Sequence, residues 1–151
     1  MIGTASARNE AFLRQLGVDE FIDYQTTAFA SIVHEVNLVV DAIPIEVDDR
    51  TDALAKETIQ RCWGILKDGG LLVSVSANPI PDAAAAARGV RGMKADAQTR
   101  RDLLEQIARL VDEGYVKPVV STVLPLKEAR RAHELIQTGH TQGKIVLWVG
   151  D

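Results

Sequence analysis

The feature that most constrains the fold of this chain is the alternation of short apolar runs with segments of helical periodicity. Residues 36–41 and 71–75 are almost continuously apolar and branched, which is typical of strands covered on both faces. Between them, apolar residues from Leu54 to Leu66 recur at three- and four-residue steps, as in a helix. Strands that alternate with helices build parallel sheets, because right-handed crossovers place the helices on both faces. The sequence therefore predicts an α/β fold with one parallel sheet.

The same pattern locates the other elements. A short apolar segment precedes Ser6, a residue type that favours helix N-caps, and Gly17 offers a stop for the helix that follows. Thr26 or Thr27 is expected to cap another helix, and the glycine pair after Asp68 to end the helix over residues 48–67. The remaining predicted strands lie at residues 21–24, 119–124 and 144–149. The remaining predicted helices lie at residues 83–87, 99–113 and 127–138.

Composition and charge limit the classes of function. The chain has 151 residues, of which 46% are hydrophobic and 25% are charged, and this balance is typical of a globular domain. The net charge is -4, and no basic stripe carries interleaved aromatic residues, which argues against a nucleic-acid partner. No apolar run approaches the length of a membrane span, and no basic and apolar leader stands at the N-terminus. We therefore expect a cytoplasmic protein without a membrane partner.

Cysteine and histidine residues give no metal-binding pattern. Cys62 is the only cysteine, so the sequence offers neither a disulfide framework nor a cysteine-rich zinc site, and its position on a helix face predicts packing. The histidines are His34, His133 and His140, and their spacing matches no paired metal motif. His133 shares a predicted helix face with small and apolar residues, so we expect it to pack there through a hydrogen bond.

Four stretches carry a resemblance to a known family. They are IGTASARNEAFLRQLGVDEFIDY, VVDA, WGILKDGGLLVSV and PVVSTVLPLKEARRAHELIQTGHTQGKIVLWV. The last is the most specific, because an Ala-His pair in a helix is followed by Gly-x-x-x-Gly-Lys and an apolar strand. Together they resemble the zinc-independent medium-chain dehydrogenases/reductases, within them the quinone oxidoreductase-like enzymes that use NADPH.

The resemblance covers only the C-terminal part of such enzymes, which begin with a barrel-like catalytic domain. It implies a partial Rossmann-like domain over residues 1–151 that lacks the first strand and its glycine-rich turn, as in a truncated or separately encoded product. Residues 115–151 would form a tail that packs on the catalytic domain in the family. In the strand order 3-2-1-4-5-6 the first strand is central, so its neighbours would keep unpaired main-chain groups. Direct pairing of those neighbours, a homodimer or a separate catalytic-domain chain would each satisfy them.

A candidate cofactor site follows the first predicted strand. Ser6, Arg8 and Asn9 gather at a helix N-terminus, where free N–H groups favour an anion, and Arg8 can form a charge-assisted fork to a phosphate. No acidic residue stands where NAD-binding domains hold the ribose hydroxyls. By the resemblance, Thr4 and Tyr24 complete this group, with Tyr24 beside the adenosine phosphate. In the alternative interpretation, Ser6 caps a helix, Arg8 is a surface charge and Tyr24 is a packed ring.

A second candidate region lies at the ends of two later strands. Asp41 ends one predicted strand and Ser74 lies near the end of the next, where this fold opens toward its ligand. By the resemblance, the main chain around Ala42 and Ser74 approaches the nicotinamide. The family commonly has glycines soon after the aspartate, whereas this chain has Ile-Pro-Ile-Glu at residues 43–46. The alternative is a turn aspartate and a core serine.

The function expected from the sequence is that of an NADP(H)-binding portion of a quinone oxidoreductase-like enzyme. No nucleophile with an attached base is present, and none is expected, because hydride transfer is the chemistry of the cofactor. We therefore expect the portion to be inactive alone, with no catalytic residue of its own. The alternative is a non-catalytic remnant that dimerises or regulates and binds nucleotide weakly or not at all.

Overall fold

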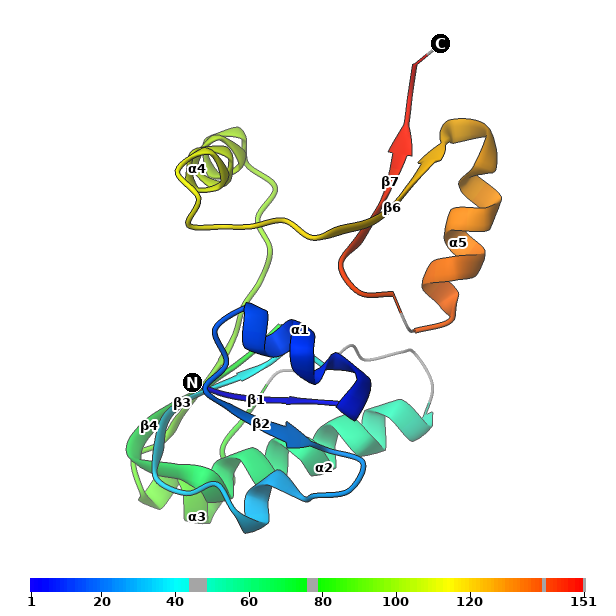
Figure 1. Cartoon of the computed structure of the whole chain (residues 1–151). Coiled ribbons are helices and arrows are strands. Elements are labelled where there is room, and N and C mark those ends of the chain that lie inside the picture. Colours follow the sequence, from blue (N-terminus) through cyan, green and yellow to red (C-terminus); the bar gives the residue numbers. More distant parts are fainter. Residues whose placement is uncertain (44–48, 76–78, 140, 151) are drawn as a thin grey trace. The chain divides into compact units, whose positions relative to one another are not determined.

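A computed structural model of the chain describes residues 1–43, 49–75, 79–139 and 141–150 (Figure 1). The chain divides into two compact units, Met1–Ala97 and Gln98–Asp151, which we call unit 1 and unit 2. Strands within each sheet are parallel, so the predicted α/β class with parallel strands and helices is confirmed. The strands form three separate sheets rather than the predicted single one.

Unit 1 contains two of these sheets. The first pairs β1 (Ile2–Ala5) with β2 (Glu20–Asp23), and the second has the order β3-β4-β5. The strands of the second sheet are β3 (Val36–Asp41), β4 (Leu66–Ser74) and β5 (Arg91–Lys94). The helices of unit 1 are α1 (Glu10–Gln15), α2 (Asp49–Ile65) and α3 (Ala83–Ala87). Short 3-10 turns, η1 (Ala7–Asn9) and η2 (Phe29–Ser31), complete it.

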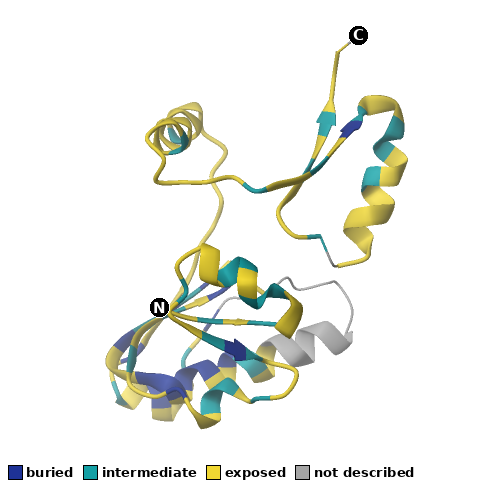
Figure 2. Ribbon diagram, in the orientation of Figure 1, coloured by how far each residue is buried: buried dark blue, intermediate teal, exposed yellow. Residues whose placement is uncertain are grey.

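The core of unit 1 lies between α2 and the second sheet. Leu66 and Leu72 of β4 are completely buried, and Cys62 and Trp63 of α2 pack in the same cluster. A second cluster joins the two sheets, because Ile22 of β2 and Ile65 of α2 pack with the half-buried apolar residues of β3. Figure 2 shows the buried residues concentrated on α2 and the neighbouring strands. The predicted packing role of Cys62 is confirmed.

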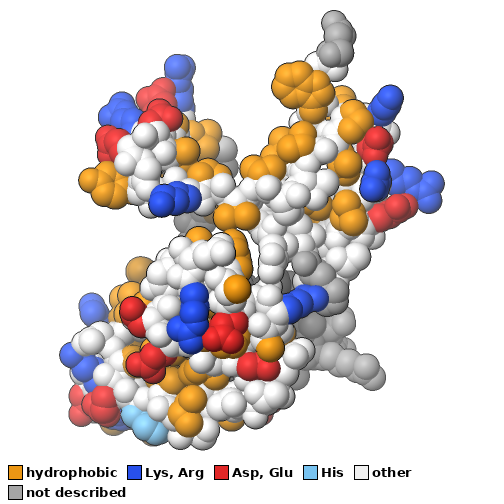
Figure 3. All heavy atoms as spheres, in the orientation of Figure 1, with side chains coloured by type: hydrophobic (Ala, Val, Ile, Leu, Met, Phe, Trp, Pro, Cys, Tyr) orange, Lys and Arg blue, Asp and Glu red, His pale blue; other side chains and the backbone are white. Residues whose placement is uncertain are grey.

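Unit 2 is built on a two-stranded sheet. Its helices are α4 (Arg101–Asp112) and α5 (Ala129–Gln137), preceded by a 3-10 turn, η3 (Leu126–Glu128). Its parallel strands are β6 (Val120–Pro125) and β7 (Lys144–Trp148). The face with Thr122, Leu124, Ile145 and Leu147 is buried or half-buried, whereas Val123, Val146 and Trp148 on the other face are exposed. Apolar side chains are accordingly visible on the surface along these strands (Figure 3).

Several predicted elements differ from the structure. The helix expected after Thr26 or Thr27 is only the turn η2, whose N-cap is Ala28. The pair Gly69-Gly70, expected to end a helix, lies inside β4, because α2 already ends at Ile65. The register of β3 against β4 shifts between Val36, which pairs with Leu66, and Leu38, which pairs with Leu71. The two glycines lie in the part of β4 between these partners, where the ladder is irregular, as in a β-bulge.

Two further predictions concern burial and are wrong. The strand β3 has the predicted bounds but is not covered on both faces, because Leu38 and Val40 are exposed. His133 lies on α5 and is exposed, so it is not a packed histidine. His140 and residues 44–48 lie outside the described residues. In the described part of the chain, no helix is long and apolar enough to span a membrane.

Candidate functional site

The first candidate group lies at the carboxyl ends of β1 and β2. The register pairs Ala5 with Asp23, and the Tyr24 N–H donates to the Ala5 carbonyl oxygen at 3.3 Å. Ser6 and Tyr24 follow these paired positions directly, so the two strands bring them to the same sheet edge. The sheet therefore places Tyr24 beside the segment from Ser6 to Asn9, although they are distant in sequence.

Ser6, predicted to cap the helix that follows, instead occupies the N-cap position of the turn η1, and its side chain makes no capping hydrogen bond, while the N-cap of α1 is Asn9. Its hydroxyl oxygen instead accepts a hydrogen bond from the Asn9 side-chain amide at 3.2 Å, and its carbonyl oxygen accepts one from the Asn9 N–H at 2.8 Å. Ser6 is buried, with 8% of its surface exposed. The Ser6–Asn9 contacts hold the tight turn that presents Arg8.

The charged residues of this segment are an exposed arginine and a paired glutamate. Arg8 is exposed, whereas Glu10, the first acidic residue after β1, accepts a hydrogen bond from Arg14 Nε at 3.0 Å. The Glu10 carboxylate is therefore neutralised within α1 by a residue one turn away. Tyr24 is 59% exposed, so it is not a packed ring, and Thr4 is exposed on β1.

The second candidate group lies at the carboxyl ends of β3 and β4. Asp41 and Ser74 are register partners, and the Ser74 hydroxyl donates to Asp41 Oδ2 at 2.8 Å. The other carboxylate oxygen, Oδ1, accepts from the Ile43 N–H at 3.2 Å. Ser74 is completely buried and Asp41 nearly so, whereas Ala42 is exposed. This pair fixes the ends of two strands and the turn that leaves β3.

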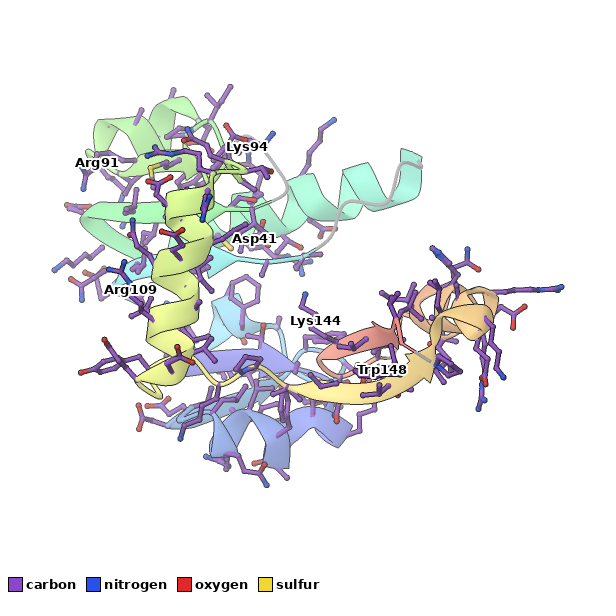
Figure 4. All side chains as sticks on the ribbon, turned by 90° about the horizontal axis from the view of Figure 1, so that it is seen from above. Asp41, Arg91, Lys94, Arg109, Lys144 and Trp148 are labelled. Carbon is purple, nitrogen blue, oxygen red and sulfur yellow. The ribbon has the colours of Figure 1, made fainter. Side chains whose placement is uncertain are left out.

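Lys94 belongs to the same sheet edge and was not predicted from the sequence. It is the register partner of Ser74 on β5, so Asp41, Ser74 and Lys94 end three adjacent strands. Figure 4 labels Asp41 and Lys94. The Nζ atom of Lys94 lies 3.5 Å from Asp96 Oδ1. The sequence analysis missed Lys94 because it missed β5. The segment RGMK has one apolar side chain, so it lacks the hydrophobic pattern that identifies a strand.

Cys62 has no reactive character. Burial, and secondarily the negative charge of Asp41, raises the pKa of the Cys62 thiol to about 12. The thiol is therefore protonated at neutral pH and is a poor metal ligand. Among the residues that the structure describes, no group of three or more His, Cys, Asp or Glu side chains could hold a metal ion. The described residues thus do not fit a zinc site.

Comparison with known proteins identifies the family. Residues 16–147 match the model of a family described as zinc-binding dehydrogenase. The chain is 27% identical to the quinone oxidoreductase of Mus musculus, covering 97% of this chain and 46% of that protein. It is 26% identical to a probable mitochondrial zinc-binding oxidoreductase of Arthroderma benhamiae, over 99% of this chain and 44% of the relative.

Solved structures give the same result. The quinone oxidoreductase from Coxiella burnetii has 32% sequence identity and a TM-score of 0.74, covering 99% of this chain and 44% of that one. An NAD-dependent alcohol dehydrogenase has 27% identity and a TM-score of 0.75, with 99% and 43% of the two chains covered. The chain thus spans less than half the length of these relatives. It belongs to the zinc-binding dehydrogenase family of medium-chain dehydrogenases/reductases and corresponds to the C-terminal region of its quinone and alcohol oxidoreductases.

Proposed function

We propose that the chain is the NADP(H)-binding portion of a quinone oxidoreductase-like enzyme and is inactive without further polypeptide. The observation that carries the proposal is the grouping of Ser6, Arg8, Asn9 and Tyr24 at the carboxyl ends of two parallel strands. In open α/β sheets, ligands bind outside this end of the strands. The mouse and Coxiella quinone oxidoreductases support the assignment of the reaction type.

The preference for NADP(H) over NAD(H) rests on Arg8. A guanidinium group can form two parallel, charge-assisted hydrogen bonds to the phosphate that distinguishes NADP(H). The Glu10 carboxylate, two residues after Arg8, accepts a hydrogen bond from Arg14, which offsets its negative charge. In the proposed complex Ser6 and Asn9 hold the turn, Thr4 lines the strand end and the exposed Tyr24 ring packs beside the adenosine.

The second group would serve the nicotinamide end of the cofactor. When bound, nicotinamide supplies the hydride chemistry, and the protein supplies position and exclusion of water. We propose that the main chain at Ala42 and Ser74 lines this end, held in place by the hydrogen bond between Ser74 and Asp41. Asp41 and Ser74 are buried, so in this proposal their side chains do not contact a substrate and only hold the main chain in place.

The region matched here covers less than half of the relatives' length, which supports a partner for the proposed enzyme. We propose either a homodimer or a separate chain with the catalytic domain, with no nucleic-acid or membrane partner. The proposed compartment is the cytoplasm, supported by the single, buried cysteine. The Arthroderma relative is described as mitochondrial, so cell fractionation would distinguish the two compartments.

Titration of the chain with 2',5'-ADP, NADPH and NADH tests the proposal. Arg8→Ala should weaken binding of NADPH and 2',5'-ADP by roughly 1.5–3 kcal/mol, as expected for hydrogen bonds to a charged group. Binding of NADH should hardly change. Arg130→Ala is the matched control, because it removes the same charge from an exposed position of α5, outside the candidate site, and should leave the preference for NADPH intact. Equal losses for NADPH and NADH in Arg8→Ala would contradict the phosphate role.

The alternative is a non-catalytic module that dimerises and binds nucleotide weakly or not at all. The observation that favours it is the exposed face of the β6–β7 sheet, where Val123 is 60%, Val146 is 40% and Trp148 is 61% exposed. Contiguous exposed apolar residues mark interaction surfaces. A dimer that dissociates in Trp148→Ser, together with no detectable 2',5'-ADP binding, would establish this alternative.

A further inference from the structure

The sheet edge of the first candidate group also carries a carboxylate, that of Asp23. Asp23 is the last residue of β2 and the register partner of Ala5, which directly precedes Ser6. It also directly precedes Tyr24 in the sequence. Asp23 therefore adjoins both segments that form the group.

The Asp23 side chain lies on the face of the β1–β2 sheet that α1 covers. A Cβ added at Gly3 would come within 3.1 Å of Leu13 of α1, so this position of β1 faces the helix. Ala5 lies two residues further along β1, and Asp23 is paired with it, so both share this face. Figure 1 shows α1 on one side of these strands and α2 on the other. The turn η1, which carries Arg8, leads directly into α1, so Arg8 and Asp23 belong to the same face.

Hydrogen bonds within the turn after β2 hold Asp23 in one position. Its carbonyl oxygen accepts from the N–H groups of Thr26 and Thr27, at 3.2 and 2.9 Å. Its carboxylate oxygen Oδ1 accepts from the Gln25 N–H at 3.0 Å, and the residue is half-buried. The second oxygen, Oδ2, is thereby held in place before any ligand binds, which lowers the entropy cost of a contact to it.

The charge of this carboxylate is not neutralised. Among the residues that the structure describes, no basic side chain forms an ion pair with Asp23, and the Gln25 N–H that binds it is neutral. Glu10, in contrast, is paired with Arg14. The candidate nucleotide site therefore combines the guanidinium of Arg8 with the negative charge of Asp23.

These two groups favour different adenosine ligands. A guanidinium favours a phosphate. A fixed carboxylate accepts hydrogen bonds from ribose hydroxyls, as acidic residues do in NAD-binding sheets. A 2'-phosphate replaces one of these hydroxyls and brings a charge of about −1.5 to −2 at neutral pH, which a carboxylate repels. Arg8 and Asp23 thus act in opposite directions on the choice between NADP(H) and NAD(H).

We propose that Asp23 is a specificity-determining residue of the candidate nucleotide site, where it favours an adenosine with a free 2'-hydroxyl and opposes the 2'-phosphate that Arg8 attracts. The chain then binds NAD(H) as well as NADP(H), and its preference for NADP(H) is smaller than Arg8 alone would produce. This inference rests on the proposed function, because it concerns the same nucleotide site.

The experiment compares 2',5'-ADP with 5'-ADP, which differ only in the 2'-phosphate, by calorimetric titration of the chain of residues 1–151. Asp23→Asn removes the charge and keeps an oxygen for the Gln25 N–H. Binding of 2',5'-ADP should tighten about fivefold, as expected when a unit charge within about one Debye length of a phosphate is removed. Binding of 5'-ADP should weaken, because an amide oxygen is a poorer acceptor than a carboxylate. Asp23→Ser also keeps an oxygen for the turn and should shift the ratio of the two affinities in the same direction.

Glu20→Gln is the matched control, because it removes the same charge from the exposed amino end of the same strand. This position is roughly 10 Å from Asp23, at about 3.3 Å per residue, so the ratio should stay unchanged. Raising the salt concentration should reduce the effect of Asp23→Asn, because salt screens the repulsion, whereas a loss of structure would not depend on salt in this way. Circular dichroism confirms that each variant is folded.

The outcomes separate this inference from the proposed function. If the ratio is unchanged in Asp23→Asn, or changes equally in Glu20→Gln, Asp23 has no role in specificity although the nucleotide site stands. If Arg8→Ala leaves the ratio unchanged while Asp23→Asn shifts it, the phosphate role of Arg8 fails and that of Asp23 is supported. A wild-type chain that binds neither 5'-ADP nor 2',5'-ADP would overturn both.

Discussion

Units 1 and 2 are built from the same parts, parallel strands joined by helices, yet they bury very different amounts of apolar surface. In the described chain, the buried hydrophobic residues all belong to unit 1 except Leu124 (Figure 2). In unit 1, α2 and α3 pack their apolar side chains against β4. In the described part of unit 2, Leu124 of the β6–β7 sheet is the only buried hydrophobic residue, with 7% of its surface exposed.

The difference shows that pairing strands is not sufficient to make a core. A parallel sheet is stable when both of its faces are covered. The β6–β7 sheet has one exposed apolar face, and the β3–β4–β5 sheet exposes Leu38 and Val40. We therefore expect unit 1 to contribute most of the stability of the chain, and unit 2 to depend more strongly on what it contacts.

The largest expected effect tests this difference directly. Leu72→Ala removes a completely buried side chain of unit 1 and should lower the free energy of unfolding by about 3–5 kcal/mol, through lost burial and a cavity. Leu124→Ala, the matched change in unit 2, should cost about 2 kcal/mol or less, because fewer buried neighbours surround it. Urea unfolding followed by circular dichroism measures both. A larger cost for Leu124→Ala would reverse the assignment of the main core.

The next effect concerns the buried pair at the sheet edge. Asp41→Ala removes the acceptor of the Ser74 hydroxyl and should destabilise the chain by about 1–3 kcal/mol, the cost of a lost buried hydrogen bond. Asp41→Asn keeps an acceptor oxygen and should cost less. The measurement is again urea unfolding. Equal costs for the two variants would show that the charge, rather than the hydrogen bond, matters.

A smaller effect comes from Cys62 and appears only at high pH. The pKa of its thiol rises from 9.0 to about 12 on folding, so above pH 9 the unfolded chain loses a proton that the folded chain keeps. This contribution to stability is present below pH 9 and is lost as the pH rises toward 12, by at most about 1.4 kcal/mol per pH unit. Cys62→Ala should show a shallower decline between pH 9 and pH 10. The same slope in both proteins would refute the buried thiol as its cause.

Long, strongly patterned elements could be predicted from the sequence. β3 has the predicted bounds, and α4 differs from its predicted range by one or two residues at each end, because periodicity specifies such elements locally. β5 was missed because its pairing comes from β4 rather than from its own residues. The turn η2 replaced a predicted helix, because capping threonines do not ensure a helix without enough residues to propagate it.

The candidate site shows the same limit. The sequence placed Asp41 and Ser74 at strand ends, and the register then brought their side chains into contact. It could not show that Tyr24 lies beside Ser6, that Arg14 engages Glu10, or that Lys94 joins the edge. These contacts depend on strand pairing and side-chain geometry, which no local pattern encodes.

The central claim is that β1 and β3 each carry one unpaired edge next to the candidate site, and amide hydrogen exchange of the free chain tests it most directly. The N–H groups of Gly3, Ala5, Val39 and Asp41 face paired strands and should exchange slowly, whereas those of Ile2, Thr4, Leu38 and Val40 should exchange rapidly. This alternation along β1 and β3 is the predicted result. Equal protection of all eight N–H groups would show that the second edges of β1 and β3 are already paired and would contradict the account.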